Sequence, residues 1–268
     1  MWIGLTSPEV DSPILALFGQ HQVWIEAARR RYDVYMCGRY VEESEFIENY
    51  HQHLFDFMDA MEQAGVGSRY NIAPSQRSLI RRWEEDAARV AWATWGFIPS
   101  WEKNEKGGRK PINARNETAH SNGVFRNAFK KRRCLVLATG YYEWEKLPAG
   151  GKQPYYIHLE DHRPFFFYGL WESWSGPKEA PLETPRTTYT ILTTESGQSV
   201  ADIHDRMPCM IGVDREELET WLDPEFQGED HLRGLLRPCD AKDLVATPVS
   251  EYVNNVRNQG PKCVTPCN

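Results

Sequence analysis

Apolar residues along the chain recur with two different periods, one typical of helices and one typical of strands. Within 44–65 they repeat at helical spacing and a glycine closes the segment, which predicts one helix. Two runs rich in apolar and aromatic residues, 77–83 and 89–95, flank a polar turn and predict a β-hairpin. By the same criteria, further strands are predicted at 134–139, 141–146, 155–159, 164–171 and 187–194, and short helices at 123–131, 215–222 and 231–236.

The order of these elements indicates the fold class. Strands joined by short turns, with helices set apart from them, predict an α+β single domain with a largely antiparallel, barrel-like β-sheet core surrounded by helices. We assign this domain to 36–268 because no linker or repeat divides it. Residues 1–35 have no clear period, and two explanations are open. This N-terminal extension is either a start-site artefact ahead of a true initiator at Met36, or a removable pro-segment. We favour the first because the stretch has no targeting composition.

Composition and charge narrow the class of protein. The chain of 268 residues has no apolar run near the ~18 residues of a membrane helix, so no membrane-spanning segment is expected. Its six cysteines form no CxxC pair and no secretory signal precedes the domain, which indicates free thiols, a cytoplasmic location and no bound metal. The formal charge of −7 argues against non-specific binding of polyanions, but the basic run 130–133 keeps nucleic acid open as a partner.

Met36 is followed by Cys37, and this pair suggests a specific chemistry. If Cys37 becomes the first residue, its α-amine and thiol stand on adjacent carbons. The reference pKa of an α-amine, about 7.7–8.0, leaves a reactive neutral fraction at neutral pH. An aldehyde condenses with such an amine to an imine, and the thiol then closes on the imine carbon to give a thiazolidine. An internal cysteine cannot do this, and an ordinary cysteine at the start of a strand is the alternative at this point.

Several polar motifs occur where strands would otherwise bury apolar residues. They are, in order, MCGR at 36–39, NIAP at 71–74, WGFIP at 95–99, INARNE at 112–117, GYYEW at 140–144, IHDRMP at 203–208 and NVRNQG at 255–260. Each is weak alone. In combination and in this order, the sequence resembles the SRAP (SOS response-associated peptidase) family, whose members shield abasic sites in single-stranded DNA.

The resemblance implies a chemical role for each of four residues. Cys37 would be the nucleophile that forms the thiazolidine with the ring-opened deoxyribose aldehyde, and Asn113 would hold its amine through the side-chain amide. Glu143 would act as general acid and base in opening the sugar and in moving protons through the imine. His204 would protonate the leaving sugar oxygen and assist reversal of the link. Because Glu143 stands between two aromatic residues, desolvation is expected to raise its pKa towards neutrality.

Four further residues are implied in DNA binding. Arg39 and Arg115 would bind the phosphates that flank the lesion, while Trp101 and Pro74 would wall or stack against the neighbouring bases. The expected partner is therefore single-stranded DNA that contains abasic sites, without a metal, an organic cofactor or a membrane. The protein is expected to be a monomer that associates with the nucleoid when it is bound to DNA.

Two other functions stay open. The same Cys37, with Glu143 and His204 in proton transfer, suits a cysteine-type peptidase or an autoprotease that cuts after Met36. A non-catalytic reader of damaged single-stranded DNA would instead rely on Trp101 and the arginines, and would not need Cys37. A chain that keeps its extension ties up the amine of Cys37 as an amide, so the thiazolidine hypothesis requires that bond to be cut.

Overall fold

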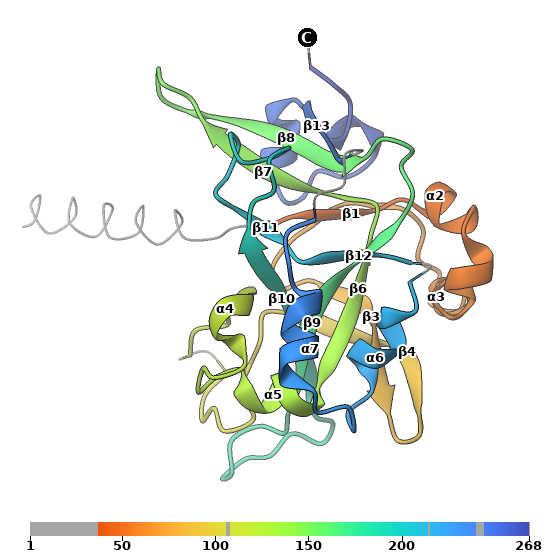
Figure 1. Ribbon diagram of the computed structural model, residues 1–268, viewed down its shortest axis with the longest axis vertical. Helices are drawn as coiled ribbons and strands as arrows, with labels where there is room; N and C mark the ends of the chain where they lie inside the picture. Colours follow the sequence, from red (N-terminus) through yellow and green to blue (C-terminus); the bar gives the residue numbers. More distant parts are fainter. Residues whose placement is uncertain (1–36, 106–107, 214, 240–243, 268) are drawn as a thin grey trace, which may run out of the picture. The chain divides into compact units, whose positions relative to one another are not determined.

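Two β-sheets make up the centre of the protein in the computed structural model, which describes residues 37–105, 108–213, 215–239 and 244–267 (Figure 1). The extension predicted at 1–35 lies outside the described residues. The smaller sheet is antiparallel and has the strand order β13-β8-β7-β1-β2. Its strands are β1 (Tyr40–Glu42), β2 (Arg69–Ile72), β7 (Gly140–Lys146), β8 (Lys152–Leu159) and β13 (Leu244–Pro248). The larger sheet consists of β3 (Arg77–Glu84), β4 (Ala87–Trp95), β5 (Asn113–Arg115), β6 (Arg133–Ala138), β9 (Phe165–Trp174), β10 (Arg186–Glu195), β11 (Arg206–Pro208) and β12 (Met210–Gly212).

Five strands of the larger sheet close into a barrel. β10 pairs with β4, β4 with β3, β3 with β6 and β6 with β9, and β9 pairs back with β10. A closed circuit leaves these strands without a free edge. The β10–β4 and β10–β5 pairings are parallel, and the other pairings of the larger sheet are antiparallel. The predicted α+β fold with a largely antiparallel, barrel-like core is confirmed.

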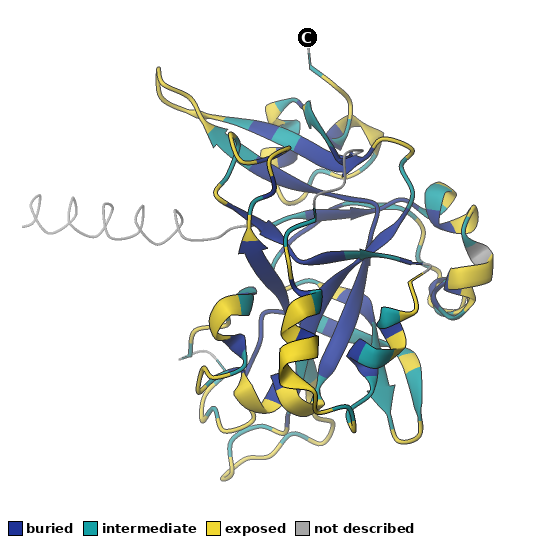
Figure 2. Cartoon of the chain, in the orientation of Figure 1, coloured by how far each residue is buried: buried dark blue, intermediate teal, exposed yellow. Residues whose placement is uncertain are grey.

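Short helices cover the strands from outside, and Figure 2 shows buried strands beneath helices with exposed outer faces. Helix α3 packs on β3 and β4, α4 on β5 and β10, α5 on β6 and β9, and α6 on β6. Within the described residues, no helix is both long and apolar enough to cross a membrane. The α-helices of this part of the chain are α2 (Ser44–Glu48), α3 (His51–Gln63), α4 (Asn116–Ala119), α5 (Arg126–Lys131), α6 (Glu217–Leu222) and α7 (Glu229–Leu235).

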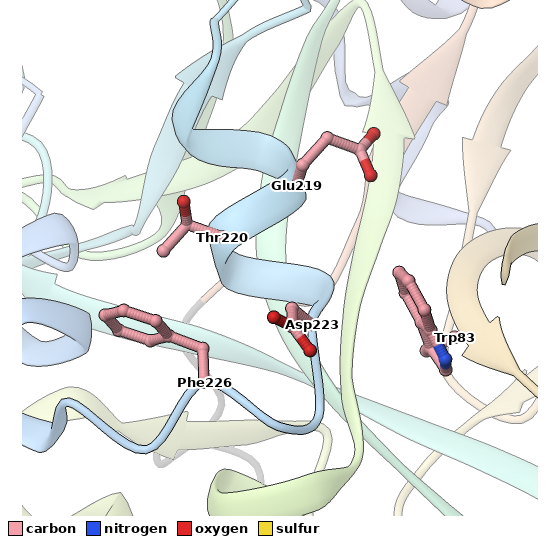
Figure 3. Close-up of a pocket in the computed structure, with 5 residues that line it drawn as sticks. All are labelled: Trp83, Glu219, Thr220, Asp223 and Phe226. Carbon is pink, nitrogen blue, oxygen red and sulfur yellow. The ribbon is translucent and has the colours of Figure 1, made fainter. Parts of the chain in front are cut away.

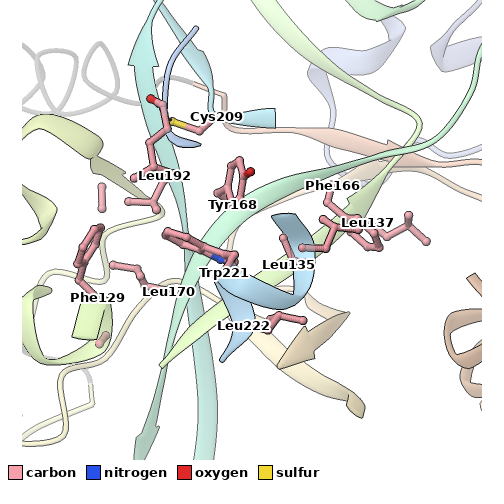
Figure 4. Packing of buried hydrophobic residues seen from close by; sticks show 14 of the residues in the cluster. Phe129, Leu135, Leu137, Phe166, Tyr168, Leu170, Leu192, Cys209, Trp221 and Leu222 are labelled. Carbon is pink, nitrogen blue, oxygen red and sulfur yellow. Dashed lines mark hydrogen bonds between the residues drawn. The ribbon is translucent and has the colours of Figure 1, made fainter. Parts of the chain in front are cut away.

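Trp221 joins α6 to the barrel. The side chain is fully buried, and its ring meets Tyr168 edge-on at 4.9 Å between ring centres and Phe129 at 6.0 Å (Figure 4). Its indole N–H donates to the carbonyl oxygen of Cys134 in β6 at 3.0 Å. The indole nitrogen, the only polar atom of the Trp221 side chain, therefore has a hydrogen-bond partner inside the core, as buried polar groups require.

The structure corrects two local predictions. The single helix predicted at 44–65 is wrong, since the segment forms α2 and α3, separated after Glu48, and Leu54 has non-helical backbone angles within α3. The basic run 130–133 is not one charged surface. Arg133 is only 1% exposed and donates to the carbonyl oxygens of Phe129 (2.8 Å) and Trp221 (2.6 Å). It ties α5 to α6 and is not available to nucleic acid.

Candidate active site around Cys37

Cys37 and Glu143 lie in direct contact. Cys37 stands three residues before Tyr40, the first residue of β1, and Tyr40 pairs with Tyr141 in β7. This pairing brings the backbone N–H of Cys37 to Glu143 Oε1, to which it donates a hydrogen bond of 2.6 Å. Cys37 is 0% exposed and Glu143 is 3% exposed. Two of the predicted site residues thus share a buried hydrogen bond, centred on the nitrogen that would become the α-amine.

The carboxyl of Glu143 has an unusual proton affinity. Burial raises its pKa to about 8, although the N–H of Cys37 acts in the opposite direction, and the charge of nearby Asp205 raises it further. Such a carboxyl is mostly protonated at neutral pH and can donate a proton. The upward shift of the pKa and its cause, desolvation, agree with the expectation, but the two sequence neighbours do not share the face of the strand on which Glu143 is buried. Because alternate residues of a strand point to opposite faces, Tyr142 and Trp144 lie on the other face of β7.

The Cys37 side chain is held in its protonated thiol form, which is a weaker nucleophile than the thiolate. Burial raises its pKa well above the ordinary value, and a charge on Glu143 would raise it further. The thiol therefore stays protonated until a neighbouring base removes its proton. The backbone of Cys37 has a φ of +36°, in the left-handed region, where a residue with a Cβ is strained by on the order of 1 kcal/mol.

His204 lies in the loop between β10 and β11. Its Nδ1 accepts a hydrogen bond from the backbone N–H of Arg206 at 3.1 Å and is also 3.0 Å from Asp205 Oδ1. The first contact needs a lone pair on Nδ1 and the second needs a proton there, so the two belong to different protonation states. Burial lowers the pKa of His204, although Asp205 acts in the opposite direction. At neutral pH the ring is mainly neutral, with its proton on Nε2 as the available donor.

Asn113 and Arg115 are held by β5, which runs parallel to β10. Asn113 is half-buried and Arg115 is exposed. A Cβ added to Gly38 would meet Ile112 Cδ1 at 4.0 Å, so the residue before Asn113 lies beside the residue after Cys37. The structure therefore brings the start of β5 to the Cys37 segment.

Arg39 and Asn71 hold the late motif in place. Arg39 Nη1 donates to Asn71 Oδ1 (3.1 Å) and to the carbonyl oxygen of Val253 (3.0 Å), and its guanidinium lies 5.8 Å from the centre of the Trp144 ring. The amide nitrogen of Asn71 donates to carbonyl oxygens at 3.0–3.1 Å, those of Val253, Asn255 and Asn258. The sequence reasoning gave Asn71 no role, although it lies in one of the quoted motifs. Arg39 supports this loop in addition to the phosphate contact predicted for it.

Pro74 and Trp101 lie in different places. Pro74 follows β2 and lies in a turn, in which the backbone N–H of Gln76 donates to the carbonyl oxygen of Ala73 at 3.2 Å. Trp101 is 61% exposed. Its loop is held by Trp174, whose indole N–H donates to the carbonyl oxygen of Glu102 at 2.8 Å. Trp174 pairs with the start of β10, whereas β5 pairs with the middle of β10. These contacts join the Trp101 loop to the end of β9, which pairs with the start of β10, and the stacking role of Trp101 stays a prediction.

Arg206 fixes the loop that carries His204. Its guanidinium forms a two-pronged ion pair with Glu117, in which Nη2 and Oε2 are 2.9 Å apart, and Nη2 also donates to the carbonyl oxygen of Thr193 at 2.8 Å. Burial by itself would raise the pKa of Glu117, but the hydrogen bonds from Arg206 outweigh it and lower the pKa. The pair joins α4, which follows Arg115, to β11. No sequence rule pairs these two motifs, so the contact was missed.

Arg206→Lys is expected to lower the free energy of unfolding by about 1–3 kcal/mol, because lysine cannot form the fork and leaves buried acceptors unpaired. Arg215→Lys is the matched control. Arg215 also forms a fork, with Glu217, but its side chain is 57% exposed, and exposed pairs contribute at most about 1 kcal/mol. Urea denaturation of both variants measures the difference. Equal losses would show that burial does not set the strength of the Arg206 pair.

A separate pocket of about 290 Å³ lies beside α6. Figure 3 shows its lining, which consists of Trp83, Glu219, Thr220, Asp223 and Phe226. None of these five is a residue predicted for the site, and they include neither a thiol nor an imidazole. We therefore assign this pocket no part in the chemistry at Cys37.

These features define a barrel protein in which a buried carboxyl, that of Glu143, contacts the backbone nitrogen of a buried cysteine. The chain belongs to the SOS response associated peptidase (SRAP) family, whose description matches residues 36–256. The match begins at the residue before Cys37 and includes each predicted site residue.

Similar proteins are matched over nearly their whole length. Abasic site processing protein YoqW of Bacillus subtilis (strain 168) is 38% identical over 229 residues, which are 85% of this chain and 99% of that protein. Abasic site processing protein YedK of Escherichia coli (strain K12) is 30% identical over 86% of this chain and 100% of its own. A solved protein from Bacteroides thetaiotaomicron has a TM-score of 0.66 at 26% identity, over 78% of this chain and 90% of its own.

Proposed function

We propose that this protein captures abasic sites in single-stranded DNA through a covalent link from Cys37, after the residues before Cys37 have been removed. The names of its relatives, abasic site processing proteins, support the class of substrate. The observation that carries the proposal is the 2.6 Å contact between the Cys37 nitrogen and Glu143. Burial opposes charge on both groups, which favours a neutral amine beside a neutral carboxylic acid.

The proposed reaction needs one proton to pass through Glu143 and return. The amine of Cys37 adds to the aldehyde carbon C1 of the ring-opened deoxyribose and forms a carbinolamine. Glu143 gives its proton to the hydroxyl, which leaves as water, and the C–N bond becomes an iminium. The Glu143 carboxylate then takes the proton of the Cys37 thiol, and the thiolate adds to C1. The thiazolidine is complete, one water has been released and Glu143 is again protonated.

The other predicted residues would serve the steps before and around this addition. His204 would protonate the ring oxygen as the sugar opens from its imidazolium form, whose Nδ1 faces Asp205 Oδ1 at 3.0 Å, while the proton of the C1 hydroxyl leaves to water. Asn113 would hold the amine, and the exposed Arg115 would contact a flanking phosphate. The carboxyl of Glu143 supplies the acid that the second step requires.

The test uses two proteins that differ only in the position of the α-amine. One begins at Cys37, and the other carries a single alanine before Cys37 and so keeps every side chain of the site. With an abasic single-stranded oligonucleotide, only the first is expected to give an adduct that survives denaturing electrophoresis. Its intact mass should equal protein plus oligonucleotide minus one water.

Three outcomes separate the functions considered. No adduct from the protein that begins at Cys37 would reject the proposal. An adduct of equal yield from the alanine-extended protein, with the alanine still present in the intact mass of the adduct, would reject the amine as the reacting group. Salt-sensitive binding without any adduct would support a non-catalytic reader of damaged DNA instead. A parallel reaction with the duplex form of the oligonucleotide tests the preference for single strands.

We further propose that the chain itself removes its extension by cutting the bond before Cys37. The strained φ of +36° at Cys37 and the position of Glu143 beside its nitrogen support this activity. The Cys37 thiol would add to the carbonyl carbon of Met36 while its proton passes to Glu143 in its ionised form, the minor form at neutral pH. The C–N bond breaks, the nitrogen leaves with a proton from Glu143, and water hydrolyses the resulting thioester.

Intact-mass analysis of the purified full chain tests self-processing. The wild-type chain is expected to begin at Cys37, whereas Glu143→Gln should retain the extension because the leaving nitrogen lacks its acid. A wild-type chain that keeps the extension in purified form would reject self-processing and leave the capture reaction to be tested on the protein that begins at Cys37.

A further inference from the structure

Tyr141 carries a buried hydroxyl for which the described residues offer no hydrogen-bond partner. The side chain is 0% exposed and its ring packs edge-on against Phe167, with 6.0 Å between ring centres. Buried polar groups are nearly always paired, so an unpaired one needs an explanation. Other buried tyrosines in the described part of the chain follow this rule through pairs or acceptors at 2.8–3.0 Å; they are Tyr40, Tyr142, Tyr156 and Tyr189.

The unpaired hydroxyl belongs to the Cys37 site. Tyr141 and Glu143 are two residues apart in β7, so their side chains lie on the same face of the strand, about 6.6 Å apart along it. Tyr141 also packs in the same buried cluster as Cys37. Burial raises the pKa of Tyr141 well above its ordinary value, and charges on Cys37 and Glu143 would raise it further. The hydroxyl therefore stays protonated and can act as a fixed donor.

We propose that the Tyr141 hydroxyl is a further substrate-binding group, which hydrogen-bonds the C4 hydroxyl of the ring-opened deoxyribose. This inference rests on the proposed function. When the sugar ring opens, its ring oxygen becomes a hydroxyl on C4, three carbons from the C1 atom that Cys37 binds. A site with a buried, unpaired hydroxyl selects a substrate that can pair with it, because a substrate without that group leaves the hydroxyl unsatisfied.

Tyr141→Phe in the protein that begins at Cys37 tests the proposal with two aldehydes. Abasic single-stranded DNA carries the C4 hydroxyl, and butanal carries no hydroxyl. The variant is expected to form the DNA adduct about tenfold more slowly, which is 1.36 kcal/mol in the barrier. It is expected to react with butanal at the wild-type rate. Intact-mass time courses measure both reactions.

Tyr189→Phe is the matched control. Tyr189 is equally buried and lies in the same cluster, but its hydroxyl is paired with that of Tyr40 at 2.9 Å. Removing an unpaired hydroxyl should raise the Tm of Tyr141→Phe by about 2–4 °C, whereas removing a paired one should lower the Tm of Tyr189→Phe. Tyr189→Phe is expected to leave the ratio of the DNA rate to the butanal rate unchanged.

Each other result overturns the inference. An unchanged DNA rate in Tyr141→Phe would show that the hydroxyl does not contact the sugar. Equal slowing with DNA and with butanal would show that Tyr141 acts on Cys37 or Glu143 and not on the substrate hydroxyl. A wild-type protein that reacts with neither aldehyde would reject the proposed function, and a wild-type adduct without the Tyr141 effect would reject this inference alone.

Discussion

Cys37→Ser, in the protein that begins at residue 37, is expected to lose the denaturation-resistant adduct with abasic DNA by about a hundredfold or more, or at least about 2.7 kcal/mol in the barrier. Serine keeps the α-amine, so the imine still forms. Its hydroxyl is a much weaker nucleophile than a thiol and does not close the ring. Sodium borohydride reduces an imine to a stable amine, and the serine variant should therefore give a near wild-type adduct only when borohydride is present.

Cys209→Ser provides the control for this experiment. Cys209 is as buried as Cys37, but it lies in the other large core cluster, where its thiol donates to the carbonyl oxygen of Leu236 at 3.5 Å. This variant should capture abasic DNA at the wild-type rate without borohydride. A serine variant at position 37 that forms the stable adduct equally well would show that the ring through sulfur is not the link.

The sequence alone predicts the long strands well, and it does not predict the short ones. The hairpin of β3 and β4 and the strands β6, β7, β8, β9 and β10 were predicted because each spans at least six residues of strand-like composition. Strands of three residues give no measurable period, and β1, β5 and β11 are of this length. They are also the elements next to Cys37, Asn113 and His204, so the part of the fold that assembles the site is the part that local patterns cannot reveal.

The contacts of the site depend on pairing between distant segments. Cys37 and Glu143 are 106 positions apart, and only the register of β1 against β7 brings them together. Desolvation was expected to raise the pKa of Glu143 and does so, but strand alternation puts its aromatic sequence neighbours on the other face of β7, so the burial comes from other parts of the fold. A motif therefore indicates which residues react, while the register decides which of them touch.

The same limit applies to the residues that support the site. Asn71 and Arg206 each stand in a recognisable motif, but their partners lie in motifs far along the chain. Both use side-chain groups that also suit nucleic-acid binding, so residue type alone does not separate a structural role from a functional one. The sequence gives no sign of a functional role for Tyr141 for a different reason, since an aromatic residue in a buried strand is expected in any core. Its unpaired hydroxyl is visible only once its surroundings are known.

Glu143→Gln is expected to change how the stability of the full chain depends on pH. Both proteins carry Cys37→Ala, which removes the thiol that self-processing needs, so both keep the residues before position 37 and the nitrogen there stays an amide. The protein with Glu143 intact in this background is the wild-type reference below. Burial raises the pKa of Glu143 from 4.5 to about 8 in the folded protein. Between these values the folded state binds a proton that the unfolded state has released, so stability is lost as pH rises. From pH 5 to pH 9 the loss in the wild type amounts to about 4 kcal/mol.

Glutamine has no proton to lose, so this contribution is absent from the variant. Wild type and Glu143→Gln should have similar free energies of unfolding at pH 5, where the wild-type carboxyl is protonated and resembles the amide. At pH 9 the variant should be more stable by about 4 kcal/mol. Urea denaturation at several pH values measures this divergence. Intact mass at each pH confirms that the bond before position 37 is uncut.

Glu145→Gln separates this effect from the loss of any carboxylate in β7. Glu145 lies two residues further along the same face, half-buried, and accepts a hydrogen bond of 2.9 Å from the Tyr155 hydroxyl. Because water reaches this carboxylate, the control should follow the wild-type pH dependence. If Glu143→Gln also runs parallel to the wild type from pH 5 to pH 9, the Glu143 carboxyl is ionised throughout this range. It then cannot be the acid that expels water from the carbinolamine, and the proton would have to come from His204 or from solvent.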